Sequence, residues 1–352
     1  MAALYDIEEQ YLKEQGIDMS RAVAKPETFR IVHTDDGLHL KDSILWLDSK
    51  LAGQLSFLSS ADEQIKTFPP QVIATEETVK IMEIFRRKPN ALVCQYNRPF
   101  SIGRLKMELL PSGHALGGAS LYLESGKNSL LYAPHIQTQK ISINRQLQLK
   151  KAKILILSAN NPDPIGVQTN HNREKEALLE KINHFRKQNK WPIIYCETLP
   201  VAQELTKYLC DQSFPLSVHH QIYKINKIYE TYGSSLGNYS QYNNRRSKNK
   251  IVLLPIAAGK NSKLLSFKDR PYFLVRSNHA EIPKFFRHNQ LDEQFSLSSA
   301  SFGNEFHDVI GKVKPKEIYF FGAYSKQYAK AFRLHRSITI NSLYPNDQPV
   351  LF

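Results

Sequence analysis

The sequence predicts an α/β protein with more than one domain, and three observations lead to that fold class. At 352 residues the chain exceeds the usual size of a single domain. Short strand-like segments separated by turn residues fill much of its first part, up to Asn160. After Asn160, strand-like and helix-like segments alternate, which is typical of a parallel sheet with crossover helices. The apolar fraction of 41% and the charged fraction of 23% are those of an ordinary globular protein.

Up to Asn160 the expected elements are mainly short strands. A helix is expected over 1–16, and an amphipathic helix over 76–87, where apolar side chains recur with helical spacing. A continuous apolar run at 154–157 predicts a strand that is buried on both faces. The other strands expected in this part are 29–32, 38–40, 44–48 and 55–58.

Beyond Asn160 the chain predicts a regular α/β unit. Helices are expected at 173–189, 200–210 and 222–232, and strands at 192–196, 251–256 and 272–275. The polar segment 233–250, rich in Gly, Ser and Asn, predicts a surface loop. The segment 295–298, a helix at 304–313 and a strand at 317–321 follow.

A glycine–histidine motif with flanking strands is the most informative pattern in the chain. Leu109–Pro111 leads into Ser112-Gly113-His114-Ala115-Leu116-Gly117-Gly118. A strand at 120–124 and a turn follow, and then a strand at 130–133 that ends in Pro134-His135. This order resembles the metallo-β-lactamase superfamily, and within it the β-CASP nucleases. That branch holds the bacterial DNA-ligase-associated exonucleases and the RNA 3′-end processing nucleases.

The resemblance covers nearly all of residues 28–340 and implies a particular form of the α/β class. It implies a metallo-β-lactamase αββα sandwich that is interrupted by an inserted, β-CASP-like parallel α/β domain. The expected limits are 1–165 for the N-terminal part of the sandwich, 166–290 for the insertion and 291–352 for the C-terminal part. Within the insertion, the run 201–205 is similar to a helix start of that family.

The metal-binding pattern of that family is largely missing. Its enzymes use two metal ions to activate a water and clamp a phosphate. The resemblance implies that His114 keeps a zinc-ligand position, whereas the position of the bridging aspartate is His135. The histidine-rich motif of the family falls on Ser60, Asp62, Gln64 and Ile65, and its later acid and histidine positions fall on Leu157, Ala300 and Phe321. Serine and isoleucine are poor zinc ligands, so the sequence predicts a degenerate site without catalytic residues or a cofactor.

A metal site of a different kind stays open as an alternative. Asp62, His114 and His135 occupy three positions that converge on one metal in the related family. Two histidines and one carboxylate can hold a single zinc, iron or manganese ion. The other interpretation is that His114 makes a structural hydrogen bond in an emptied pocket and that His135 is incidental.

The positive charge of the chain is concentrated. The formal net charge is +14, and residues 241–290 carry 11 Lys and Arg against two acids. Such a field attracts polyanions, although a merely solubilising surface is the alternative. The residues expected to contact nucleic acid, at a wall of the cleft between the domains, are Arg245, Arg246, Lys248, Lys250 and Arg276.

Together these features favour a catalytically degenerate nuclease homologue that binds nucleic acid or serves as a scaffold in DNA repair or RNA processing. The nucleic acid is expected to be single-stranded DNA or RNA, and the protein partner an active nuclease or a ligase. The alternative is an active metal-dependent exonuclease or phosphoesterase with a rewired single-metal site. Three widely spaced cysteines, and the lack of a signal pattern or a long apolar segment, predict a cytoplasmic protein without a membrane partner.

Overall fold

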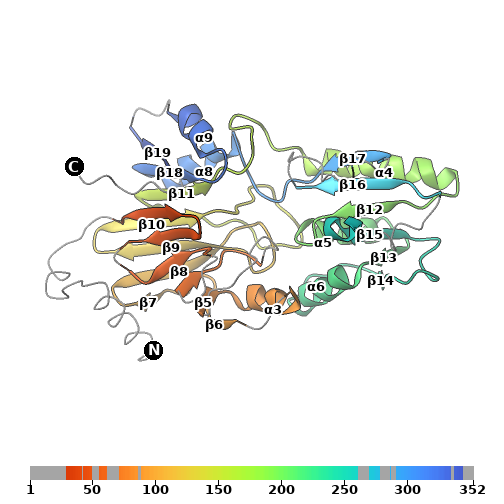
Figure 1. The fold of residues 1–352 in the computed structure, drawn as a ribbon, viewed down its shortest axis with the longest axis horizontal. Coiled ribbons are helices and arrows are strands. Elements are labelled where there is room, and N and C mark those ends of the chain that lie inside the picture. The colour runs from red at the N-terminus through yellow and green to blue at the C-terminus, as the bar shows by residue number, and fades with distance from the viewer. Residues whose placement is uncertain are drawn as a thin grey trace.

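The computed structural model describes residues 29–41, 43–49, 55–61, 71–85, 89–260, 269–277, 286, 291–333 and 337–343. The helix expected over 1–16 and the candidate ligand Asp62 lie outside these ranges. The described chain forms three sheets with helices, which confirms the α/β class. Figure 1 shows two of the sheets on one side of the molecule and the third on the other.

The first sheet has six strands in sequence order. It contains β1 (Ile31–Thr34), β2 (Gly37–Leu40), β3 (Leu45–Leu47), β4 (Leu55–Phe57), β5 (Gln71–Ala74) and β6 (Asn90–Val93). The pairings are antiparallel from β1 to β3 and parallel from β3 to β6. The helix α3 (Glu76–Phe85) links β5 to β6, so this half of the sheet already shows the parallel crossover pattern.

The second sheet has seven strands in the order β19-β18-β11-β10-β9-β8-β7. Its members are β7 (Phe100–Ile102), β8 (Leu105–Pro111), β9 (Ala119–Ser125), β10 (Asn128–Ala133), β11 (Ile154–Ser158), β18 (Glu317–Phe321) and β19 (Thr339–Leu343). The strands β7 to β10 form antiparallel pairs, whereas β10, β11, β18 and β19 are parallel. The chain therefore leaves this sheet after β11 and returns to it at β18.

The first two sheets pack face to face around one apolar core. Side chains of both sheets, among them Leu47, Phe57, Leu121 and Tyr132, form a single buried cluster. On the outer face of the second sheet, α8 (Glu305–Val313) and α9 (Ser325–Phe332) cover a further cluster. Residues of α3 cover the outer face of the first sheet. The layers are therefore helix, sheet, sheet and helix, which is one of the stable ways to bury two amphipathic sheets.

The third sheet is entirely parallel and has the order β14-β13-β15-β12-β16-β17. Its strands are β12 (Ile193–Cys196), β13 (Leu216–Val218), β14 (Ser240–Gln241), β15 (Ile251–Pro255), β16 (Tyr272–Arg276) and β17 (Glu293–Ser296). The helices α4 (His171–Lys187), α5 (Val201–Asp211) and α6 (His220–Thr231) contribute to a core on one face. A short 3-10 helix, η1 (Ile256–Lys260), follows β15.

The third sheet and the sandwich meet through an apolar contact. Leu199, which follows β12, and Tyr229 of α6 belong to the same buried cluster as Ala115 and Leu116. The Tyr229 hydroxyl also accepts a hydrogen bond from the backbone N–H of Leu116 at 3.0 Å. The carboxyl end of β12 therefore faces the loop that carries His114. No helix in the described part of the chain is long and apolar enough to cross a membrane.

Candidate functional site at the junction of sandwich and third sheet

Three neighbouring parallel strands of the second sheet end at the same edge, facing the junction. In the pairing register, Ala133 of β10 lies beside Leu157 of β11, and Ser158 lies beside Phe321 of β18. The residues that follow these strands are therefore brought together, as expected for the carboxyl edge of a parallel sheet. One of these residues is His135, two positions beyond β10.

His114 reaches the same place through a tight turn. Gly113 has a φ of 78°, and a Cβ at this position would lie 2.4 Å from the Gln137 carbonyl oxygen. Only glycine allows that approach, so the glycine of the motif has a backbone reason. The His114 ring is buried, and its Nδ1 lies 2.7 Å from the carbonyl oxygen of Ser299. Because a carbonyl only accepts, Nδ1 carries the proton of that bond.

The two histidines singled out from the sequence lie against each other. The rings of His114 and His135 are stacked, with their centroids 5.3 Å apart and an angle of 27° between the planes. His135 is half-buried. The structure thus brings two of the three candidate metal ligands together, while Asp62 lies outside the described residues.

Asp48 is a residue of this site that the sequence reasoning missed. It follows β3 in the left-handed region, with a φ of 48°. Its carboxylate accepts hydrogen bonds from the Ser59 backbone N–H at 2.8 Å, the Ser59 hydroxyl at 2.7 Å and the Tyr132 hydroxyl at 2.8 Å. Burial raises the pKa of Asp48, and the nearby charge of His135 opposes that rise.

The remaining positions of the expected metal motif carry side chains that do not bind metal. Leu157 is fully buried in the core beneath α8 and α9, and Ser60 is buried beside Ser59. The Phe321 ring packs 5.8 Å from the ring of Tyr132. Within the described ranges, no three His, Cys, Asp or Glu side chains form a group that could hold a metal ion.

The turn Ser298–Ser301 closes the junction over these side chains. The carbonyl of Ser298 accepts three hydrogen bonds, from Gln137 Nε2 at 2.7 Å, Gln168 Nε2 at 2.8 Å and His171 Nε2 at 2.9 Å. The backbone N–H of Ser301 donates to the carbonyl of Ile136 at 2.6 Å. The turn is thus fixed both to the sandwich and to the first helix of the third-sheet region.

A buried ion pair supports that turn from behind. His171 Nδ1 lies 2.8 Å from the Glu204 carboxylate, and the Lys175 ammonium lies 2.6 Å from the same oxygen. Both His171 ring nitrogens face acceptors, a geometry that suits an imidazolium with two N–H donors. Burial alone would raise the pKa of Glu204, but His171 and Lys175 outweigh it and hold this pKa below its usual value.

The structure does not place the five candidate nucleic-acid contacts on one surface. Arg245, Arg246 and Lys248 are exposed on a turn that Ser247 anchors to β13, where its hydroxyl lies 3.0 Å from that of Ser217. Lys250 directly precedes β15, at the amino edge of the third sheet, whereas Arg276 ends β16 at the carboxyl edge. Only Arg276 is therefore at the edge that faces the sandwich.

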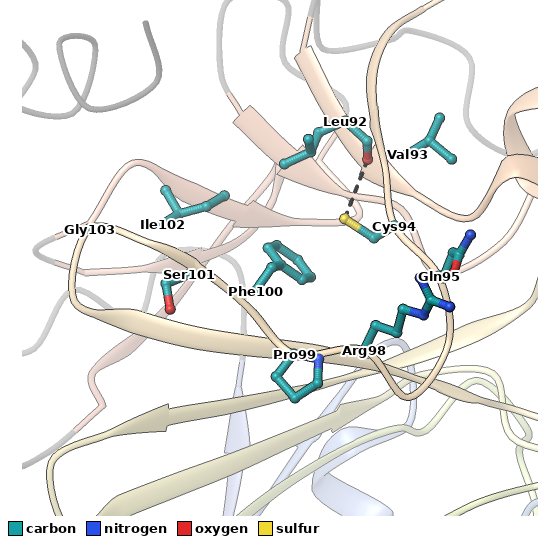
Figure 2. Close-up of a pocket in the computed structure, with 10 residues that line it drawn as sticks. All are labelled: Leu92, Val93, Cys94, Gln95, Arg98, Pro99, Phe100, Ser101, Ile102 and Gly103. Atoms are coloured by element: carbon teal, nitrogen blue, oxygen red, sulfur yellow. Dashed lines mark hydrogen bonds between the residues drawn. The ribbon is translucent and has the colours of Figure 1, made fainter. Parts of the chain in front are cut away.

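A separate apolar pocket of about 390 Å³ lies at the edge strands β6 and β7 (Figure 2). Its lining includes Leu92, Val93, Cys94 and Phe100, with Arg98 as its cation. Burial raises the pKa of the Cys94 thiol to about 11, so the reactive thiolate is disfavoured. The pocket is lined from a different part of the sandwich than His114 and His135, and its lining contains no acid–base pair.

Comparisons with known proteins show distant similarity. No family model matches the chain. The chain is 20% identical over 303 residues to a "Probable DNA ligase" of Opitutus terrae, an alignment that covers 84% of this chain and 29% of that protein. The chain thus spans less than a third of the length of this relative. A crystal structure of a protein of unknown function from Enterococcus faecalis is similar with a TM-score of 0.54 and 12% identity, over 83% of this chain and 79% of the other, which supports the fold alone.

Proposed function

We propose that this protein is a catalytically degenerate homologue of the β-CASP nucleases that binds single-stranded nucleic acid, or serves as a scaffold, in DNA repair. The fold argument has two parts. The layers of helix, sheet, sheet and helix correspond to the metallo-β-lactamase sandwich that the glycine–histidine motif implies. A parallel α/β unit enters the chain between β11 and β18, as a β-CASP domain would. The limits expected from the sequence are 166 and 290, and the third sheet extends beyond the second limit through β17 to Ser296.

The proposed loss of catalysis rests on a single observation, namely which residues occupy the junction. His114 and His135 keep their places, but the positions that should complete a dinuclear site carry Ser60, Leu157 and Phe321. The carboxylate of Asp48, near His135, has both oxygens engaged by Ser59 and Tyr132. Such a group stabilises the fold and is poorly placed to hold a metal or to accept a proton from water.

The choice of DNA rests on the relative. A protein named as a probable DNA ligase contains a segment similar to 84% of this chain, so we place this chain beside a ligase, as a fused or separate partner. The exposed cations Arg245, Arg246 and Lys248, together with Lys250, supply sequence-independent attraction to phosphates. Arg276, at the edge facing the sandwich, is the cation best placed for a strand in the junction.

The test is a salt titration of oligonucleotide binding, followed by fluorescence anisotropy. We expect binding of single-stranded DNA whose logarithmic affinity falls with the logarithm of salt by roughly 0.7 per phosphate contact. Absence of binding to any oligonucleotide at low salt would leave only the scaffold role.

Elemental analysis tests the alternative function. We expect less than one tightly bound zinc, iron or manganese ion per chain. Close to one ion, lost in Asp62→Ala or His135→Ala, would favour the single-metal exonuclease or phosphoesterase instead.

A further inference from the structure

The strand order of the third sheet contains a topological switch point. From β12 the chain crosses through α5 to β13, on one side of β12 in the sheet. From β16, the neighbour of β12, the chain goes to β17 on the opposite side. The helix α5 packs on one face of the sheet, whereas Phe286, between β16 and β17, packs on the other. In open parallel sheets, ligands bind outside the carboxyl ends of the two strands at such a point.

A charged pair occupies this position. Glu197 directly follows β12, and Arg276 is the last residue of β16. One carboxylate oxygen of Glu197 accepts hydrogen bonds from the backbone N–H of Ser277 at 2.9 Å and from its hydroxyl at 3.1 Å. Burial raises the pKa of Glu197, while the bonds from Ser277 and the charge of Arg276 oppose that rise.

The other carboxylate oxygen, Oε2, has no such partner. It is buried and accepts no hydrogen bond within the described structure. The same holds for the hydroxyl oxygen of Thr198 and for the amide oxygen of Gln203 in the first turn of α5. A buried polar atom without a partner is costly, and native structures leave few of them. The carboxylate oxygen of Glu197 and the amide oxygen of Gln203 accept only, so they suit a ligand that brings hydrogen-bond donors, whereas the hydroxyl of Thr198 can donate or accept.

The ligand class follows from the chemistry of bases in a single strand. The exocyclic amino group of cytosine donates to a carboxylate, a pairing that glutamate also makes in the grooves of DNA. Thymine has no amino group, and its only ring N–H lies between two carbonyl oxygens that repel a carboxylate. A lone carboxylate oxygen therefore discriminates amino-bearing bases from thymine.

We propose that the carboxyl ends of β12 and β16 form a base-reading subsite, in which Glu197 Oε2 accepts a hydrogen bond from the exocyclic amino group of an unpaired nucleobase. Arg276 lies beside the base and neutralises the adjacent phosphate or stacks on the ring. This inference rests on the proposed function, because it requires a strand in the junction. It adds a base preference to a protein otherwise expected to bind any sequence.

The test compares binding of 12-nucleotide oligo(dC) and oligo(dT) by fluorescence anisotropy at one salt concentration. The wild type should bind oligo(dC) about tenfold more tightly, the worth of one hydrogen bond to a charged group. In Glu197→Gln, the two donors of Ser277 hold the amide oxygen in the place of Oε1, so the NH2 group replaces Oε2. A donor at this position favours the thymine carbonyls. The ratio of the affinity for oligo(dC) to the affinity for oligo(dT) should therefore fall to one or below.

Two further variants keep the proposal falsifiable. Glu197→Asp keeps the charge but shortens the side chain by one methylene, which withdraws the oxygen from the base. The preference for oligo(dC) should therefore be lost, and oligo(dT) should not be preferred instead. Glu180→Gln removes an exposed carboxylate of α4, and it should leave the ratio unchanged although it alters the net charge equally. An unchanged ratio in both Glu197 variants would overturn the subsite while leaving the proposed function intact. Absence of binding to any oligonucleotide would overturn the subsite and leave only the scaffold role of the proposed function.

Discussion

Two carboxylates in this molecule follow strands of parallel pairs, and their surroundings differ. Asp48 follows β3 and accepts three hydrogen bonds, so both of its oxygens are satisfied by Ser59 and Tyr132. Glu197 follows β12 and has one oxygen engaged by Ser277 and one without a partner in the described structure. Burial raises the pKa of both. The comparison separates a carboxylate with two satisfied oxygens from one that keeps a buried oxygen without a partner in the described structure.

The largest effect should come from removing the satisfied carboxylate. Asp48→Ala leaves the Tyr132 hydroxyl and the Ser59 donors without their acceptor inside the sandwich, at a cost of about 3–5 kcal/mol in the free energy of unfolding. Urea denaturation measures this loss. Glu197→Gln is the matched control, because the Ser277 bonds remain, and it should change stability by less than about 1 kcal/mol. Equal losses in the two variants would remove the distinction.

The next effect concerns the turn that joins the two regions. His171→Ala removes the bonds to Ser298 and Glu204 and leaves Glu204 paired only with Lys175. We expect a loss of about 2–4 kcal/mol in the free energy of unfolding. His184→Ala, on an exposed part of the same helix, should cost less than about 0.5 kcal/mol in urea denaturation. An unchanged free energy of unfolding in His171→Ala would show that the turn Ser298–Ser301 does not need the bonds of His171.

A smaller effect should appear in the pH dependence of stability. Burial, followed by the neighbouring charge of His220, lowers the pKa of His219 to about 4. The unfolded chain therefore binds a proton that the folded chain rejects between pH 6.5 and about 4, and stability should fall as the pH drops through this window. Thermal unfolding between pH 7 and 4 measures this decline. His219→Asn keeps a side chain that can cap α6 and should flatten this part of the profile.

The smallest effect on stability is expected from the exposed cations. Replacing Arg245, Arg246, Lys248 and Lys250 with serine should change the melting temperature by no more than about 2 °C, because three of these side chains are exposed. If the turn contacts phosphates, the salt dependence of DNA binding should become shallower by roughly 0.7 per lost contact. If the slope of log affinity against log salt is unchanged, the bound strand does not contact this turn and lies near Arg276 instead.

Most of the fold could be predicted from local patterns. The apolar patterns within β11, β12, α5 and α6 are enough to predict these elements, and their expected bounds agree with the structure within a few residues. The expected return of the chain at 295–298 differs from the structure, because β17 (Glu293–Ser296) still pairs with β16. Parallel pairing depends on distant residues, and a short strand at a sheet edge carries little signal of its own.

The site was predicted less completely, for a physical reason. His114 could be found because its turn needs glycines at fixed positions, and His135 because it follows a strand. Asp48 stands at the end of an expected strand, and that position was the signal available for it. Its role depends on Tyr132, which lies 84 positions away and meets it only through packing of the two sheets. Glu197 likewise becomes distinctive only when strand order places Arg276 and Ser277 beside it.

A cleavage assay on labelled single-stranded DNA tests the central claim most directly. The protein is incubated with oligonucleotide and added zinc, manganese or magnesium, at concentrations where anisotropy shows binding. The account predicts bound and intact DNA with each metal, in the wild type as in His114→Ala. Metal-dependent shortening of the strand that stops with chelator and disappears in His114→Ala would contradict it.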